Sequence, residues 1–572
     1  MKAQVHKPAS RFRISTIMLL IFVVPMGLAV RAFDLHVSDK EFLQEQGDAR
    51  SLRTIPVVAH RGMVVDRNGE PLAVSTPVDS IWAQPQEFEV SPQQLSQLAK
   101  LLEMRPQEIS NLVNEKKQDD KQFVYLKRRI NPAQAQKVID LDISGISSLR
   151  EYRRYYPTGE VTAHVVGFTN VDDVGQEGIE LAHEQSLRGT DGSQLVMKDR
   201  LGRVVKPVDL IKAPKPGKDL VLSIDRRLQY LTYRELKRAV FANKAKSGSA
   251  VVLDVQTGEV LAMVNQPSFN PNNRQELIGS RYRNRVATDT FEPGSTVKPF
   301  TIAAALETGR FKPGTMIDTA PGYLKVGSNV VRDIHNYGRI DLSTIIQKSS
   351  NVGASKIALA IDPLKLLNMH ERIGYGSLTE SGFPGEAEGE LHHPRVWRDI
   401  ERATLSFGYG LSVTTLQLAR SYLVLASDGY IKPVTFELQT SPVQGEQVIQ
   451  AKYVQQVRKM LQAVVEAGGT ATEAQVPGYS VAGKTGTVKK LGANGYSEDK
   501  YVATFVGMAP ADHPRLVMAI TIHEPRGEHY YGGLVAAPVF SSVMAGALRL
   551  MDIPPDDISQ SNLNLALVGG QQ

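Results

Sequence analysis

The sequence predicts an α+β protein in three parts: an N-terminal transmembrane helix, an α+β pedestal domain, and a larger domain with helices packed on an antiparallel sheet. Three observations lead to this prediction. One uncharged apolar run lies near the N-terminus, and a linker rich in Pro and Lys divides the rest of the chain. After the linker, two blocks of apolar strands enclose a series of helical segments.

Composition limits the classes of function. At 572 residues the chain is too long for one compact domain, and 42% hydrophobic with 22% charged residues is a globular balance. Cysteine is absent, which excludes disulfides and thiolate sites, and we expect no metal and no cofactor. The 66 basic residues exceed the 60 acidic ones only slightly and form no block beyond the N-terminus, so we expect no nucleic-acid partner.

The apolar run from Ile14 to Val30 is just long enough to span a membrane, and it extends to residue 33 if Arg31 reaches the interface. The preceding tail, 1–13, is basic without an acidic residue, which orients it toward the cytoplasm. A buried core helix and a cleaved signal peptide are the alternatives. The run has no polar face, and Ala29–Ala32 is a poor cleavage site. We therefore predict an uncleaved anchor over 14–33.

Beyond the anchor we expect a helical stalk over 34–55, a pedestal domain over 56–218, a second domain over 219–555 and a flexible tail over 556–572. In the pedestal, helical stretches are predicted around 91–115 and 132–140. In the second domain the expected elements are a strand at 219–225, an amphipathic helix over 226–245, two strands within 249–265, an antiparallel pair at 501–510 and 515–525, and a closing helix over 538–551.

Three short motifs carry the candidate chemistry: Ser295-Thr296-Val297-Lys298, Ser349-Ser350-Asn351 and Lys484-Thr485-Gly486-Thr487. Each has a decoy elsewhere in the chain, at 497–500, 268–270 and 246–248 respectively. We expect the decoy at 497–500 in a charged loop and the one at 246–248 at a helix end, where Lys and Gly are common without chemistry.

Ser295 follows Pro293-Gly294 and opens a helical run in which Pro299 is tolerated only near the start. Its hydroxyl then lies at the positive end of the helix, with Lys298 on the same face. A serine attacks only when a base takes its proton, and a lysine can be that base only where burial or another cation lowers its pKa. The alternative is an N-cap serine followed by an exposed lysine.

The other two motifs offer the remaining groups. A break between helical runs at 341–348 and 352–361 can point Ser349 and Asn351 into a cleft, to relay a proton and hold a substrate amide. The alternative is a helix N-cap. Residues 482–488 predict a strand. Its glycines allow another backbone to approach closely, and its Lys and Thr side chains can bind a carboxylate. The alternative there is a turn.

In order and context the three motifs match the penicillin-recognising serine enzymes. The chain resembles a class B penicillin-binding protein, specifically a division-type (septal) peptidoglycan D,D-transpeptidase of Gram-negative bacteria, over roughly residues 14–552. Further segments carry the resemblance: Arg61-Gly62, Asp66-Arg67-Asn68-Gly69, Arg154-Tyr155-Tyr156-Pro157, Gly175, Gly178-Ile179-Glu180, 408–413 and 530–533.

The resemblance implies a role for each motif residue. Ser295 would be the acylated nucleophile, Lys298 its base, and Ser349 and Asn351 the proton relay and the amide-orienting group. The terminal carboxylate of D-Ala-D-Ala would bind to Lys484, Thr485, Gly486 and Thr487. Backbone N–H groups of Ser295 and Thr487 would form the oxyanion hole. The pocket would also be lined by tyrosines: Tyr409, Tyr501, Tyr530 and Tyr531.

The same resemblance implies the partners and the location. Peptidoglycan stem peptides and β-lactam antibiotics would be the ligands. A lipid-linked glycan polymerase and other division proteins of the membrane would be the partners. The chain would cross the inner membrane once, with its catalytic domain in the periplasm.

Other functions remain as alternatives. Residues 478–485 also match the phosphate-binding loop of nucleotide hydrolases, which requires a helix after the lysine. A β-lactamase would need the E-x-x-L-N signature, which is absent between Asn351 and Lys484. A penicillin-binding sensor that acylates without turnover and an elongation-type transpeptidase share the three motifs.

Overall fold

The computed structural model describes residues 11–43, 45, 52–198, 204–273, 275, 279–492 and 495–557. The chain divides into two compact units, each made of separate stretches. Unit 1 comprises Met1–His60, Pro77–Arg153 and Gly189–Pro216, and unit 2 comprises Arg61–Thr76, Arg154–Arg188 and Gly217–Gln572. The predicted pedestal segment therefore contributes residues to both units.

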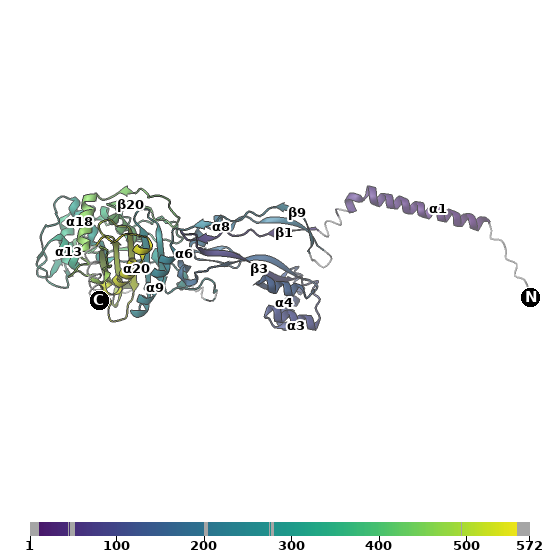
Figure 1. Cartoon of the computed structure of the whole chain (residues 1–572), viewed down its shortest axis with the longest axis horizontal. Coiled ribbons are helices and arrows are strands. Elements are labelled where there is room, and N and C mark those ends of the chain that lie inside the picture. Colours follow the sequence, from purple (N-terminus) through teal and green to yellow (C-terminus); the bar gives the residue numbers. More distant parts are fainter. Residues whose placement is uncertain are drawn as a thin grey trace, which may run out of the picture. The chain divides into compact units, whose positions relative to one another are not determined.

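The N-terminal apolar segment forms one continuous helix, α1, over Arg11–Phe33 (Figure 1), followed by a π-helical turn over Asp34–Ser38. Its 23 residues rise about 34 Å, which suffices for a hydrocarbon core of about 30 Å. The window that covers the span has a mean hydropathy of 2.2, and none of it is buried. A core helix would bury such a surface.

The stalk is not helical throughout. Residues 40–43 are helical, but Leu52–Val57 forms strand β1, which pairs antiparallel with β8 (Gly192–Lys198). The expectation of a helix is therefore wrong for residues 52–55, because β-branched residues here complete a sheet with a distant strand. Residues 46–51 of the stalk lie outside the described residues, as do 1–10 of the basic tail and 558–572 of the predicted flexible tail.

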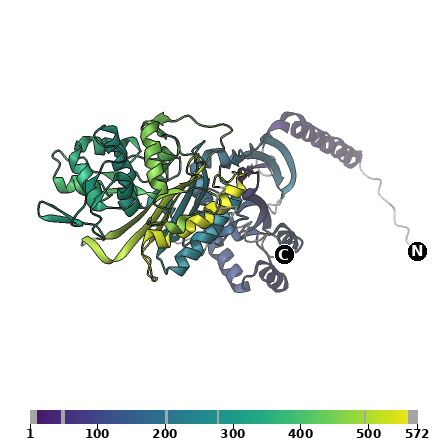
Figure 2. The ribbon, with the colours of Figure 1, turned by 60° about the vertical axis from the view of Figure 1, so that its left-hand side comes forward.

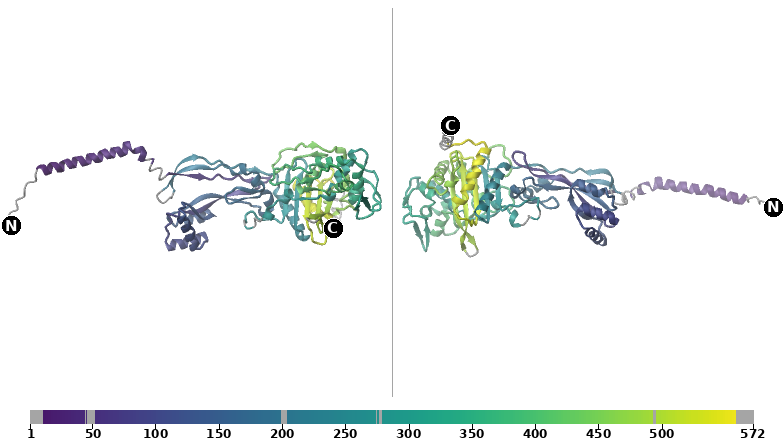
Figure 3. Two further views of the ribbon diagram at one scale, coloured as in Figure 1. Left: turned by 180° about the vertical axis from the view of Figure 1, so that it is seen from behind. Right: turned by 60° about the horizontal axis from the view of Figure 1, so that its bottom comes forward.

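Unit 1 combines a sheet in the order β1-β8-β9 with helices that pack together beside strand β4 (Figure 3). The predicted helical stretch at 91–115 is two helices, because Glu103 (φ 52°) ends the first and Pro106 begins the second. The remaining bounds are β3 Pro71–Ala83 and β5 Ile146–Tyr155, whose ends belong to unit 2, and β4 Val124–Ile130, β9 Val204–Lys212, α3 Pro92–Leu102, α4 Pro106–Gln118 and α5 Pro132–Ile139.

Unit 2 is built on a five-stranded antiparallel sheet in the order β12-β11-β24-β23-β22. The predicted strands form it: β11 Ser247–Asp254, β12 Val260–Gln266, β22 Ala482–Gly492, β23 Gly495–Ala509 and β24 Leu516–His523. Strand β22, which carries the third motif, is an edge strand. One of its long sides is therefore open to a peptide or ligand.

Helices cover both faces of this sheet. Ile522 lies beside Gly248 on the face where Leu236 of α9 (Arg226–Ala242) packs. The next residue along the strand, Thr521, points to the other face and bonds to Thr415 of α17 (Thr415–Ala426). The closing helix α20 (Ala537–Leu550) lies beside α9 (Figure 2). Helices thus cover both faces of the central part of the sheet, while the paired ends of β22 and β23 around residue 495 are exposed.

The remaining elements of unit 2 connect and surround this sheet. The strands are β2 Val64–Val65, β6 Phe168–Thr169, β7 Gly175–Glu177, β10 Leu220–Val221, β13 Thr290–Phe291, β14 Ile317–Asp318, β15 Tyr323–Val326, β16 Asn329–Arg332, β17 Arg339–Ile340, β18 Glu390–Leu391, β19 Leu411–Thr414, β20 Tyr430–Ile431 and β21 Glu446–Gln447. The helices are α6 Ala163–Val166, α7 Gly178–Ala182, α8 Glu184–Arg188, α10 Gly279–Tyr282, α11 Arg285–Thr288, α12 Lys298–Glu307, α13 Leu342–Lys348, α14 Asn351–Ala360, α15 Pro363–Arg372, α16 Asp399–Leu405, α18 Ala451–Gln462 and α19 Gly532–Val535.

Two decoy motifs lie elsewhere than expected. Ser497–Lys500 belongs to strand β23 rather than to a loop, and Lys500 is exposed there. Ser247 and Gly248 begin strand β11 rather than ending a helix, since α9 already stops at Ala242. Neither of these segments lines the cavity that holds the three candidate motifs.

The core of unit 2 contains a histidine that makes folding sensitive to acid. His370 on α15 is fully buried, stacks on Tyr375 at 5.7 Å between ring centroids, and neither ring nitrogen bonds to any described residue. Burial lowers the pKa of His370 to about 4. Because the unfolded chain binds the proton more readily, this histidine lowers the free energy of unfolding progressively below about pH 6.5, by on the order of 3 kcal/mol below pH 4.

We therefore expect His370→Phe to raise the melting temperature relative to the native chain at pH 4.5 and to change it much less at pH 8. Thermal unfolding of the full chain in detergent between pH 4 and pH 8 measures this difference. His513→Gln, at an exposed site, is the control and should show no such trend. A difference between His370→Phe and the native chain that is constant across pH would contradict the assignment.

Candidate active site

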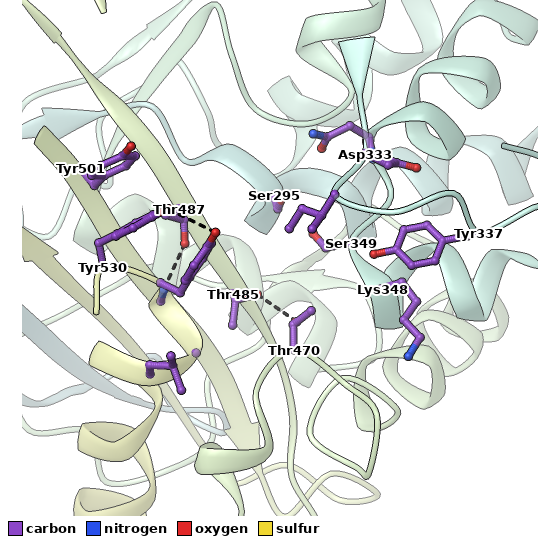
Figure 4. A pocket seen from close by; sticks show the side chains of 16 residues that line it. Ser295, Asp333, Tyr337, Lys348, Ser349, Thr470, Thr485, Thr487, Tyr501 and Tyr530 are labelled. Carbon is purple, nitrogen blue, oxygen red and sulfur yellow. Dashed lines mark hydrogen bonds between the residues drawn. The ribbon is translucent and has the colours of Figure 1, made fainter. Parts of the chain in front are cut away.

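A cavity of about 500 Å³ in unit 2 brings the three motifs together (Figure 4). Its lining includes these residues predicted from the sequence: Ser295, Ser349, Asn351, Thr485, Thr487, Tyr501, Tyr530 and Tyr531. The two motif lysines are fully buried behind this lining, and each bonds to one of the lining serines. The helical region therefore supplies two motifs, and the edge strand of the sheet supplies the third.

Ser295 lies in a 3-10 turn, Gly294–Val297, that leads into α12. The helix thus starts slightly later than the sequence predicts. Gly294 has φ 56°, and its N–H donates to the carbonyl of Gly408 at 3.1 Å. A Cβ on Gly408 would lie 2.1 Å from the carbonyl oxygen of Gly294. These two glycines let two backbones touch, and the contact fixes the segment that presents Ser295.

Lys298 is fully buried, and its Nζ lies within hydrogen-bond reach of four oxygens. Two of them can only accept: the carbonyl of Ser349 at 2.5 Å and Oδ1 of Asn351 at 2.7 Å. The other two are hydroxyls, Ser295 Oγ at 3.0 Å and Ser349 Oγ at 3.2 Å. A neutral amine has two N–H donors and one lone pair. The two acceptors take both donors, and the lone pair is left facing the hydroxyls.

The electrostatics favour that neutral form. Burial lowers the pKa of Lys298 well below its ordinary value, and the nearby charge of Lys484 lowers it further, while the Asp333 carboxylate raises it. Burial also lowers the pKa of Lys484, to about 7. The site therefore holds two lysines that both titrate far below 10.5. A base near Ser295 and a cation near Thr485 can exist together at neutral pH.

Ser349 and Asn351 occupy the break between α13 and α14. Ser349 has φ 59° in the left-handed region, and its Oγ accepts from Lys484 Nζ at 3.0 Å and lies 3.2 Å from Lys298 Nζ. The N-cap of α14 is the residue between them, Ser350, whose Oγ accepts from Gly353 N at 2.9 Å. The N-cap alternative thus applies to Ser350, which leaves both flanking side chains free to face the cavity.

The third motif is part of strand β22, not a turn and not a loop before a helix. This rules out the phosphate-binding loop, which needs a helix after the lysine. Thr485 Oγ1 lies 3.0 Å from Thr470 Oγ1, and Thr487 Oγ1 accepts from Gly532 N at 3.0 Å. A Cβ on Gly486 would lie 3.0 Å from the Pro293 carbonyl oxygen, so glycine allows the strand to press on the Ser295 segment.

Three of the four predicted tyrosines form one aromatic wall. Tyr530 stacks on Tyr501 at 4.2 Å and on Tyr531 at 4.5 Å between ring centroids. The structure does not place Tyr409 in this cavity. Its ring packs edge-on against Tyr496 at 5.6 Å and lines a neighbouring cavity beside Glu292.

Several lining residues were missed by the sequence reasoning: Asp333, Ile334, Tyr337, Lys348, Thr470, Gly532, Gly533 and Leu534. Asp333 accepts hydrogen bonds from Ser350 and Asn351, and Lys348 donates to the carbonyl of Gly468 at 2.7 Å. Thr470 follows two glycines typical of a turn, and Asp333 lies two residues after the short apolar run Val330-Val331. No local pattern indicates that these side chains face a site far along the chain.

The comparisons with known proteins agree with this geometry. The chain matches the penicillin-binding protein dimerisation domain over residues 56–222 and the penicillin-binding protein transpeptidase domain over residues 248–545. It is 44% identical to "Peptidoglycan D,D-transpeptidase FtsI" of Escherichia coli, over 93% of this chain and 90% of that one. It is 43% identical to "Probable peptidoglycan D,D-transpeptidase PenA" of Neisseria meningitidis, over 96% and 95%.

Among solved structures, penicillin-binding protein 3 of Mycobacterium tuberculosis in complex with aztreonam superposes with a TM-score of 0.67 at 27% identity, covering 88% of this chain and 98% of that one. The three motifs meet in one cavity, both domain families match, and the similarity extends over nearly the whole chain. The chain therefore belongs to the class B penicillin-binding proteins, which join a dimerisation domain to a serine transpeptidase domain.

Proposed function

We propose that the cavity around Ser295 is where this chain carries out peptidoglycan D,D-transpeptidation. As a member of this family the chain is a serine transpeptidase that acts on stem peptides and binds β-lactams. The residue roles below are the proposal. The observation that carries them is the bonding of Lys298: its Nζ has two partners that can only accept, and it lies 3.0 Å from the Oγ of Ser295.

In the acylation step Ser295 Oγ attacks the carbonyl carbon of the penultimate D-Ala, and its proton passes to neutral Lys298 Nζ. The carbonyl oxygen gains negative charge, which the N–H groups of Ser295 and Thr487 stabilise. When the C–N bond breaks, the proton moves from Lys298 through Ser349 Oγ to the departing amine of the terminal D-Ala.

In the transfer step the amine of a second stem peptide attacks the ester carbon of the acyl-enzyme. The amine loses a proton to Lys298, the new amide forms, and Ser295 Oγ leaves and regains the proton. Every group is restored, so the cycle needs no cofactor. A penicillin-binding sensor would stop at the ester, and added acceptor amine would not release it.

Substrate binding uses the other end of the cavity. Lys484 in its charged form, with Thr485 and Thr487, provides donors for the terminal carboxylate, and Gly486 lets the strand lie close to the substrate. Asn351 uses one amide N–H on the carbonyl of Arg332 at 3.1 Å. Its second N–H remains for a substrate carbonyl. The tyrosine wall of residues 501, 530 and 531 provides apolar contact for the peptide.

We expect one covalent adduct per chain after treatment with a penicillin, located on Ser295. Intact-protein and peptide mass spectrometry measure the stoichiometry and the position. Ser295→Ala should give no adduct, whereas Ser497→Ala, in the decoy motif, should react like the native chain. An adduct on Ser349 or Ser497 would refute the assignment of the nucleophile.

We expect a bell-shaped dependence of the acylation rate on pH. The rate rises with pH as Lys298 becomes neutral, through a pKa well below 10.5. It falls above about pH 7 as Lys484 loses the charge that attracts the carboxylate. Stopped-flow measurement with a chromogenic cephalosporin provides the profile.

Two lysine variants check this account of the profile. Lys298→Arg should lose about 10²–10⁴-fold in rate, because a guanidinium stays protonated. Lys356→Arg is the matched control, because Lys356 donates to the carbonyl of Asp318 at an exposed position and does not line the cavity. Near-native acylation by Lys298→Arg would remove Lys298 from the role of base.

We further propose that α1 anchors the chain in the inner membrane with its basic tail in the cytoplasm, and that the enzyme acts in septal wall synthesis with a lipid-linked glycan polymerase and other division proteins. The unburied apolar surface of α1 and the charge of the tail support the topology. The near full-length similarity to the FtsI of Escherichia coli supports the role in division.

We expect a shortened chain that starts at Asp34 to be soluble and to react with penicillin, because all three motifs lie in unit 2. Cells depleted of the full chain should form filaments, and the shortened chain should not restore septation. Light microscopy of depleted cells and the mass of the mature protein test this. Full complementation by the shortened chain, together with a mature N-terminus near Ala32, would refute the proposal that α1 is an uncleaved membrane anchor.

A further inference from the structure

Asp333 is a carboxylate inside the cavity to which neither the three motifs nor the sequence pattern assigns a role. It directly follows strand β16 and lines the cavity with Ser295 and Ser349 (Figure 4). We propose that Asp333 is a positioning residue of this reaction, which fixes the Ser349–Asn351 segment against Lys298 and supplies a negative charge near the buried amine of Lys298. This inference rests on the proposed function.

The carboxylate accepts three hydrogen bonds from one short segment. Oδ1 accepts from the backbone N–H of Asn351 at 2.5 Å and of Val352 at 3.0 Å. Oδ2 accepts from the hydroxyl of Ser350 at 2.5 Å. These donors are the N-cap residue and the first two residues of α14. Asp333 therefore caps this helix from outside its own chain segment, where the helix dipole also favours an anion.

The same short stretch controls the side chain of Asn351. The carbonyl of Arg332 accepts from Asn351 Nδ2 at 3.1 Å, while Asn351 Oδ1 accepts from Lys298 Nζ. Ser349, immediately before the cap, holds φ 59°, a conformation that a serine adopts only when its surroundings enforce it. The two acceptors that engage the N–H groups of Lys298 thus both belong to the segment that Asp333 holds.

Charge gives Asp333 a second effect. Among the described residues that line the cavity it is the only acidic one and Lys348 is the only basic one, and the charge of Asp333 acts on the buried Lys298. The other titratable groups of the lining are four tyrosines, at 337, 501, 530 and 531. The negative charge raises the pKa of Lys298 against the effects of burial and of Lys484. Its removal should leave Lys298 neutral to a lower pH.

Two variants distinguish the positioning effect of Asp333 from the effect of its charge. Asp333→Asn removes the charge and weakens the cap, so we expect acylation about 10–10²-fold slower at the optimum and an acidic limb of the pH profile about one unit lower. Asp333→Glu keeps the charge but moves the carboxylate by one methylene. We expect it to lose rate as well, while its acidic limb stays where the native chain has it.

The matched control is Asp362→Asn. Asp362 caps α15 by accepting from Leu364 N at 2.9 Å, and it does not line the cavity. It undergoes the same chemical change at the N-terminus of another helix, where it is itself the N-cap residue, so its acylation rate and pH profile should be native. Rates are measured on the full chain in detergent and divided by the fraction of chain that a penicillin titrates on Ser295, which corrects for any unfolded protein.

The outcomes are distinct. Slower acylation of both Asp333 variants, with the acidic limb displaced only in Asp333→Asn, supports the inference. A native rate in Asp333→Asn, or a loss of rate that matches Asp362→Asn, would overturn it. An unchanged acidic limb in Asp333→Asn would refute the claim that the charge of Asp333 acts on Lys298. A native chain without an adduct on Ser295 would instead refute the residue roles of the proposed function, and the titration shows this first.

Discussion

The buried amine of Lys298 is the constraint on which the rest of the site depends. A lysine in a fully buried position has to be neutral or compensated, and this one is surrounded by two oxygens that only accept and two hydroxyls that can donate. That arrangement suits an uncharged amine with a lone pair on the nucleophile. The 3-10 turn of Ser295 and the break between α13 and α14 hold these four oxygens in place.

Several local features that cost conformational free energy help to hold these oxygens around Lys298. Ser349 holds a left-handed backbone, Gly294 and Gly408 bring two chains into contact, and Gly486 lets β22 approach the nucleophile segment. Each is a conformation or contact that an unconstrained chain avoids, and each lies at the site. The same environment gives two lysines different tasks: Lys298 faces hydroxyls and acceptors as a base, whereas Lys484, with a pKa near 7, can carry the charge that binds a carboxylate.

Much of the fold and of the site follows from local patterns. The strands of the sheet, α9 and α20, and the break at Ser349 were predictable because periodicity and helix breaks act within a few residues. The strand at 52–57 was not, because its pairing with β8 joins residues about 140 positions apart. Asp333 and Thr470 were missed for the same reason, since their neighbours at the site are distant in sequence. Tyr409 lies beyond the cavity because its ring packs against Phe407 and Tyr496 in the adjacent one.

The protonation state of Lys298 is the central claim, and NMR of the full chain labelled with ¹³Cε-lysine measures it directly. The Lys298 resonance is assigned by its loss in Lys298→Arg and followed from pH 5 to pH 11. Our account predicts that Lys298 changes from ammonium to amine well below 10.5, with a second transition near 7 from Lys484. A Lys298 signal that remains that of an ammonium group up to about pH 10 would contradict it.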